Sequence, residues 1–97
     1  MEPRAGGFGD VQPADEEIKS LVTKVKTETE RKLGKKFGVF EAVSYSSQVV
    51  CGTNYIIKVK VGENEYVHLK IFEALPCYGG KIELNEVEGG KTLADAL

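Results

Sequence analysis

Residues 53–73 read TNYIIKVKVGENEYVHLKIFE. On both sides of the Gly62-Glu63-Asn64 turn, apolar residues recur at every second position, which is the period of a β-strand. A connection this short joins antiparallel strands, because a parallel crossover needs a dozen or more residues. The stretch therefore predicts a hairpin of strands 53–61 and 65–73. One of its faces is apolar and carries Tyr55, Ile57, Val59, Val61, Val67, Leu69 and Ile71.

The flanking sequence supplies a partner for that apolar face. From about residue 14 to 33 the apolar period changes to that of a helix, with acidic residues in the first turn and Gly34 as a stop. Residues 37–50 and 81–88 predict two further strands. The expected fold class is α+β, with one α-helix packed across a twisted antiparallel β-sheet. The helical stripe consists of Ile18, Leu21, Val22, Val25, Thr29 and Leu33.

Length and composition predict one soluble domain. The chain has 97 residues, 41% of them hydrophobic, so two domains would each be too small and disorder throughout is excluded. We interpret residues 1–97 as a single domain, with the polar, Gly-rich residues 1–12 as a flexible arm. The net charge of −2 argues against nucleic acid and anionic membranes as partners. No secretory signal or membrane span is visible, which predicts a cytoplasmic location.

The residue types present also restrict the chemistry. His68 is the one histidine, and no spacing typical of metal ligands occurs, so we expect no metal and no cofactor. Cys51 and Cys77 are expected to be free thiols in a reducing compartment. Either thiol could form a catalytic pair with His68, but nothing else in the chain suggests an oxyanion site, so we predict no catalytic residue and no enzyme.

Two connections are unusually apolar. The segment Gln48 to Gly52 should form a hairpin loop, yet it stays apolar up to its glycine. The structural explanation is that Val49 and Val50 simply end a strand; the functional one is an exposed apolar patch that binds a partner. Leu75-Pro76 lies in the loop after strand 65–73, which opens at the same end of the sheet. The two loops and the arm would then make one apolar edge, with the 62–64 turn at the far end.

These residues carry a family resemblance. Gln48-Val49-Val50-Cys51-Gly52 fits the Gln-x-Val-x-Gly motif of the cystatin superfamily. The surrounding sequence closely resembles the stefins, the intracellular type 1 cystatins, over roughly residues 6–76. Besides the motif, the resemblance rests on Gln12-Pro13, Lys35 to Ser44, Ser47 to Gly62, Val67 to Leu69 and Leu75-Pro76. Secreted cystatins differ by carrying a signal peptide and disulfides.

The resemblance implies a reversible, tight-binding inhibitor of papain-like cysteine proteases such as cathepsins. Three segments would fill the protease cleft. The implied protease-binding residues are Gly6, Gln48, Val49, Val50, Cys51, Gly52, Leu75 and Pro76. Gly7 and Gly9 are rival placements for the arm glycine. Cys51 stands where stefins usually have a small alanine, and Cys77-Tyr78-Gly79-Gly80 departs from the usual second loop.

The sequence is also compatible with two other function classes. One is a non-inhibitory protein-binding module on the same fold, and the other is an enzyme that uses Cys51 or Cys77. For the assembly we expect mainly a monomer, with a domain-swapped or disulfide-linked dimer as the alternative.

Overall fold

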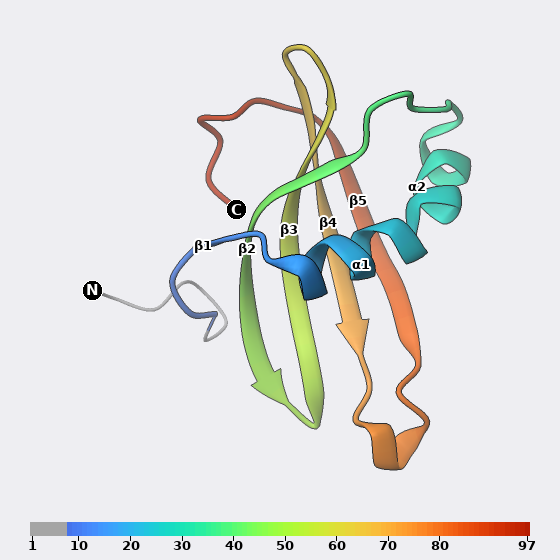
Figure 1. Ribbon diagram of the computed structural model, residues 1–97, viewed down its shortest axis with the longest axis vertical. Helices are drawn as coiled ribbons and strands as arrows, with labels where there is room; N and C mark the ends of the chain where they lie inside the picture. Colours follow the sequence, from blue (N-terminus) through green and yellow to red (C-terminus); the bar gives the residue numbers. More distant parts are fainter. Residues whose placement is uncertain (1–7) are drawn as a thin grey trace.

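Every stretch with a period of two forms a strand of one sheet (Figure 1). The computed structural model describes residues 8–97. The sheet has the order β1-β2-β3-β4-β5, and all neighbouring strands are antiparallel. With the helices, this confirms the α+β class. In chain order the elements are β1 (Gln12–Pro13), α1 (Glu16–Lys24), α2 (Lys26–Leu33), β2 (Glu41–Val50), β3 (Gly52–Gly62), β4 (Glu65–Glu73), the 3₁₀-helix η2 (Pro76–Tyr78) and β5 (Ile82–Lys91).

The first strand was not expected. Gln12 pairs with Tyr45 and Pro13 with Ser44, at the outer edge of β2. A proline is tolerated at a sheet edge because its missing N–H removes no bond from a central ladder. Two residues carry no readable period, so the sequence alone places them in the arm. The end of that arm is therefore paired with the sheet.

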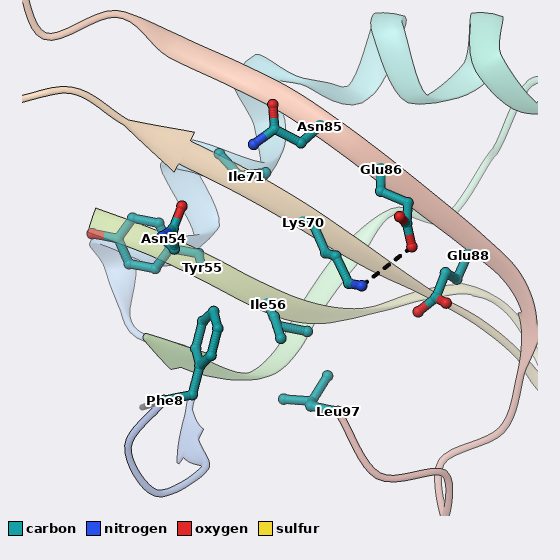
Figure 2. A pocket seen from close by; sticks show the side chains of 10 residues that line it. All are labelled: Phe8, Asn54, Tyr55, Ile56, Lys70, Ile71, Asn85, Glu86, Glu88 and Leu97. Carbon is teal, nitrogen blue, oxygen red and sulfur yellow. Dashed lines mark ion pairs between the residues drawn. The ribbon is translucent and has the colours of Figure 1, made fainter. Parts of the chain in front are cut away.

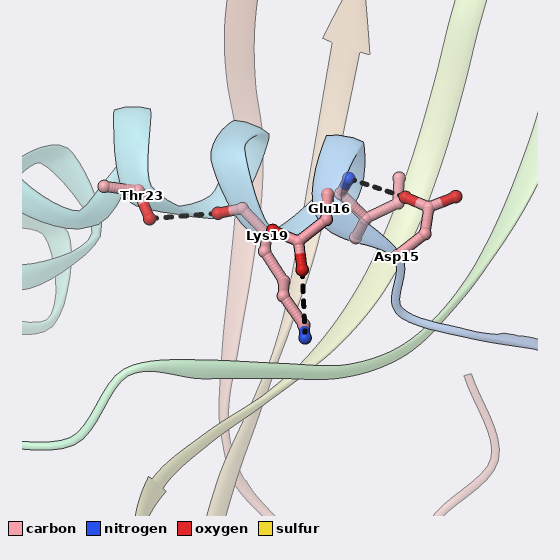
Figure 3. A network of polar contacts seen from close by, with 5 residues as sticks. Asp15, Glu16, Lys19 and Thr23 are labelled. Carbon is pink, nitrogen blue, oxygen red and sulfur yellow. Dashed lines mark hydrogen bonds and ion pairs between the residues drawn. The ribbon is translucent and has the colours of Figure 1, made fainter.

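The predicted single helix 14–33 is two helices. Asp15 caps α1 by accepting a hydrogen bond from the Ile18 amide at 2.9 Å (Figure 3). The helix is interrupted at Val25, whose φ of −103° and ψ of 6° are not helical. Just before the break, the Thr23 hydroxyl donates to the Lys19 carbonyl, a contact that bends helices. The hydrophobic stripe continues across the break, so the periodicity did not reveal it.

The predicted strand 37–50 begins later, at Glu41. The Phe37 amide donates to the Glu30 carboxylate at 2.9 Å, so it is bonded to α2 instead of a neighbouring strand. The Phe37 side chain still enters the core. β2 also contains an irregularity in its register between Ala42 and Ser44. At the other end of the chain, β5 extends three residues beyond the predicted 81–88.

The core forms between the helices and the apolar face of β3 and β4, as predicted. α1 lies across this face in Figure 1. Most hydrophobic side chains on these two surfaces are less than a tenth exposed, whereas Leu33 and Tyr55 are only partly buried at the margin. The buried set from these elements is Ile18, Leu21, Val22, Val25, Ile57, Val59, Val61, Val67, Leu69 and Ile71.

The opposite face of the sheet is partly covered by the C-terminal tail, residues 92–97. Lys58 and His68 point to this face and are adjacent in the β3–β4 register, yet they are only 5% and 2% exposed. The Lys58 ammonium donates to the backbone carbonyls of Leu93 and Asp95, the latter at 2.6 Å. The tail therefore buries two polar side chains that the alternation alone would leave toward solvent.

Residues 8–97 contain neither a helix that could span a membrane nor a cluster of metal ligands. Neither helix combines the length and the apolar character needed to cross a lipid bilayer. No three His, Cys, Asp or Glu side chains in this part of the chain gather in a way that could hold a metal ion.

Burial of His68 predicts a stability change in mildly acidic solution. Burial lowers the pKa of His68 below its ordinary value of 6.5, and the positive charges of Lys58 and Lys91 add to this, against the opposing effects of Glu88 and Asp95. Below about pH 6.5 the unfolded chain binds a proton at His68 that the folded chain resists, so the free energy of unfolding should fall. Above that pH this contribution is fully present.

Urea denaturation at pH 7.5, 6.5, 5.5 and 5.0 checks this expectation. His68→Gln cannot titrate in this range and should show a shallower pH dependence than the natural chain. Because His68 is the one histidine in the sequence, no second imidazole contributes. Identical slopes for the two proteins would contradict the expectation.

Candidate functional site

The β2–β3 connection is a very tight, apolar hairpin. Val50 pairs with Gly52, which leaves Cys51 alone at the tip. The side chain of Val49 is 82% exposed and that of Val50 47% exposed. Apolar side chains this exposed at the end of a regular, paired ladder form a patch that a partner could cover. The structure thus places Val49, Val50 and Cys51 together at the surface.

Gly52 allows this tip to approach β4 closely. Its φ of 128° lies in a region that L side chains rarely adopt. A Cβ atom at this position would lie 2.6 Å from the Glu73 carbonyl oxygen and 2.7 Å from Cζ of Phe72. Both the backbone conformation and the lack of space therefore require glycine, and the hairpin tip is held against the end of β4.

Gln48 is positioned differently from the two valines. It is half-buried, and its side-chain oxygen accepts a hydrogen bond at 3.1 Å from the amide of Asn54, its partner across the β2–β3 ladder. A cross-strand amide pair of this kind fixes the register close to the tip. Gln48 thus supports the hairpin, whereas Val49 and Val50 present the surface.

The β4–β5 connection is an ordered loop with its own exposed apolar residues. Pro76 begins η2, and the amides of Tyr78 and Gly80 both donate to the Leu75 carbonyl, at 2.8 and 3.0 Å. Gly79 and Gly80 have positive φ and close the turn. Leu75 is 39% exposed and Tyr78 is 71% exposed. Tyr78 was not among the predicted site residues, although a large aromatic between a proline and two glycines in a loop could have been noted.

Both loops open at the same end of the sheet, as expected, and the turn at 62–64 lies at the opposite end (Figure 1). The pairing of Thr53 with Glu73 shows that the two loops leave the sheet from adjacent ladder positions. We call Val49, Val50 and Cys51 with Leu75, Pro76 and Tyr78 the loop edge. It unites seven of the eight predicted residues, counting Gln48 and Gly52 as its support.

The eighth predicted residue, Gly6, lies outside the described residues, as does Gly7. Gly9 is described: its amide donates to the Ser47 carbonyl at 3.0 Å, and its own carbonyl accepts from the Ser46 hydroxyl at 2.7 Å. Followed backwards from Pro13 to Gly9, the chain runs along β2 from Ser44 toward its Val50 end. The described part of the arm therefore runs along the edge of β2 toward the strand end that carries the loop edge.

The loop edge carries no charge of its own. Neither 48–52 nor 75–80 contains an acidic or basic residue. Behind the edge, the Tyr55 hydroxyl donates to the Glu73 carboxylate at 3.5 Å, and burial together with the negative charges of Glu73 and Glu17 raises the pKa of Tyr55. Tyr55 therefore remains a neutral donor at physiological pH. A surface of this kind favours apolar contact and backbone hydrogen bonding over charge pairing.

The arrangement does not assemble a nucleophile and a base. Cys51 and Cys77 are both free and exposed on the loops. His68 is buried in the middle of β4, four positions before Phe72 and beneath the C-terminal tail. A Cys–His pair, which would require hydrogen-bonding distance between the two side chains, is thus not formed by either thiol.

Comparison with known proteins agrees with this geometry. Residues 6–93 match the cystatin domain family. The chain is 42% identical over its full length to cystatin-B of Oplegnathus fasciatus, covering 97% of that protein. It is 44% identical to stefin-C of Bos taurus over 98% of the chain and 94% of that protein. It is also 45% identical to leukocyte cysteine proteinase inhibitor 1 of Sus scrofa, over 99% and 93%. The chain therefore belongs to the cystatin family as a stefin-type member, and proteins of this family are inhibitors, not enzymes.

Proposed function

We propose that the protein is a reversible, tight-binding inhibitor of papain-like cysteine proteases of the cathepsin type, and that it fills their active-site cleft with the N-terminal arm and the two hairpin loops. The observation that carries this proposal is the exposed Val49-Val50 pair on a hairpin tip held in place by Gly52. The name of the porcine relative, a cysteine proteinase inhibitor, supports the same class of target.

The proposed mechanism is obstruction without cleavage. The hairpin tip enters the cleft beside the catalytic thiol of the protease, and Val49 and Val50 fill the space that a substrate would occupy. The tip backbone is held in the β2–β3 ladder up to the Val50–Gly52 pair. In the proposed complex it therefore lies beside the nucleophile and places no carbonyl carbon in position for attack. A tip that is already ordered binds with a smaller loss of conformational entropy.

The apolar side chains of the two loops do not account for tight binding on their own. Full burial of Val49, Val50 and Leu75 would contribute about 1.5–3 kcal/mol each, or roughly 5–9 kcal/mol in total. Nanomolar affinity needs about 12 kcal/mol, after the cost of association. In the proposed complex, Pro76 and Tyr78 extend the contact on one side of the hairpin. The arm, with Gly6, extends it on the other side, and backbone hydrogen bonds complete it.

We further propose a cytoplasmic, mainly monomeric protein, on the basis of the resemblance to the intracellular stefins. The exposed thiols of Cys51 and Cys77 offer a route to disulfide-linked dimers under oxidising conditions. Because Cys51 lies at the hairpin tip, a dimer linked through it would be unable to enter a protease cleft.

Titration of papain with the intact protein tests the proposed function. We expect loss of activity on a chromogenic peptide at one-to-one stoichiometry, and no effect on trypsin or pepsin. A variant with both Cys51→Ala and Cys77→Ala should still inhibit at one-to-one stoichiometry, because neither thiol acts as a nucleophile. Full papain activity at micromolar protein would reject the proposal in favour of a non-inhibitory binding module.

Val50→Asp tests whether the hairpin tip enters the cleft. The carboxylate stays hydrated in the free protein but must lose water in an apolar cleft, at a cost of several kcal/mol. We expect inhibition to weaken by about 100-fold or more, mainly through faster dissociation, against every papain-like protease. Val39→Asp is the matched control, because Val39 is similarly exposed, at 42%, and lies outside the loop edge. Equal inhibition constants for the Val50 and Val39 variants would show that the hairpin tip is not part of the interface.

Gly52→Ala tests the constraint behind the tip. The new methyl group would meet the Glu73 carbonyl and the Phe72 ring, in addition to an unfavourable φ that by itself costs about 1–3 kcal/mol. Gly79→Ala separates the two effects, since Gly79 has a φ of 95° but open space around it. We expect urea denaturation to show a larger loss of stability for Gly52→Ala than for Gly79→Ala. Equal losses would mean that the close approach to β4 is unimportant.

A further inference from the structure

The C-terminal tail is attached to the outer face of the sheet by a buried charge. The ammonium of Lys58 in β3 donates to the carbonyls of Leu93 and Asp95 while only 5% of the residue is exposed. A turn holds the tail in this shape, since the Thr92 amide donates to the Asp95 carboxylate at 2.7 Å. Burying an ammonium costs free energy unless oxygen atoms replace its bound water. Removing the Lys58 ammonium should therefore detach the tail, and removing the tail should expose Lys58 to solvent.

The tail ends in a groove that it shares with the N-terminal segment. The groove has a volume of about 640 Å³ on the outer face of the sheet, and its lining includes Ile56, Phe8 and Leu97. Figure 2 shows Phe8 and Leu97 on either side of Ile56, one from each end of the chain. The ion pair between Lys70 and Glu86, 3.3 Å long, belongs to the same groove, with both side chains about half exposed. The apolar side chains of Phe8, Ile56 and Leu97 lie together in another part of it.

Phe8 directly precedes the point where the arm is attached to β2. Gly9 makes both of its backbone hydrogen bonds to β2, with Ser46 and Ser47. The Phe8 side chain, which lies beside Ile56, is therefore one residue away from this attachment to β2. Leu97 lies on the other side of Ile56, so the tail completes the apolar surface that Phe8 faces across the groove.

We propose that residues 92–97 brace the root of the N-terminal arm, with Lys58 as the positioning residue. A root that is already ordered loses less conformational entropy when the protein binds in a protease cleft. The consequence for inhibition rests on the proposed function; the brace itself does not. The brace makes the C-terminal tail, which is remote in sequence from the three binding segments, a determinant of how well the arm binds.

Amide hydrogen exchange tests the brace without a protease. In a chain ending at Thr92, exchange of the Gly9 amide should become about three- to tenfold faster, while that of the Ala14 amide, bonded to Val43, should stay unchanged. Lys58→Met should have the same effect. Lys60→Met is the matched control, because Lys60 is on the same strand and face and makes no hydrogen bond to the tail within the described chain. Unchanged Gly9 exchange in both the shortened chain and Lys58→Met would overturn the proposal.

Inhibition constants against papain test the functional consequence. Four chains are compared: the intact protein, the chain ending at Thr92, the chain beginning at Gly9, and the chain with both truncations. Removal of the tail should weaken inhibition about three- to tenfold in the intact background and have no effect once residues 1–8 are absent, because coupled sites are not additive. An equal loss in both backgrounds would show that the tail does not act through the arm. If the intact protein fails to inhibit, the proposed function is rejected, while the exchange result still decides on the brace.

Discussion

The packing of the helices on one face of β3 and β4 determines where everything else in this protein can lie. The apolar stripe around Leu21 and Val25 covers the central part of that face and leaves uncovered the end of the sheet from which residues 48–52 and 75–80 project. The loops at this end can therefore present side chains to a partner without disturbing the core. The loop edge results from this arrangement, with the packed layers behind it and two short connections in front.

The sequence predicted the parts of this structure that produce a periodic pattern of apolar residues. The period of two in β3 and β4 and the helical stripe gave the α+β class and most of the core, because burial of one face acts on many residues at once. It did not predict features that depend on single contacts. The helix break at Val25, the late start of β2 after Phe37 and the two-residue strand β1 each depend on one or two hydrogen bonds, and these leave no periodic signal.

The functional site also had some features that the sequence predicted and others that depended on single contacts. The motif from Gln48 to Gly52 could be recognised because hairpin loops are normally polar and this one is apolar. The predicted topology then placed Leu75 and Pro76 at the same end of the sheet. The steric requirement for glycine at position 52 could not be predicted from the sequence. It arises from the Phe72 ring and the Glu73 carbonyl, some twenty positions further along the chain. The burial of Lys58 and His68 was likewise hidden, because strand alternation says which face a residue points to but not whether a distant segment covers that face.

The attachment of Gly9, Gln12 and Pro13 to β2 has a consequence for solubility. A sheet edge with unpaired amides and carbonyls is a template for pairing with another chain, and β2 would offer such an edge. The segment that leads into the arm occupies part of it, with a proline that cannot extend the ladder outward. At the opposite edge, β5 carries Glu83, Glu86 and Glu88, whose charges discourage stacking of like strands. The same few residues that lead toward the loop edge thus also protect the sheet from self-association.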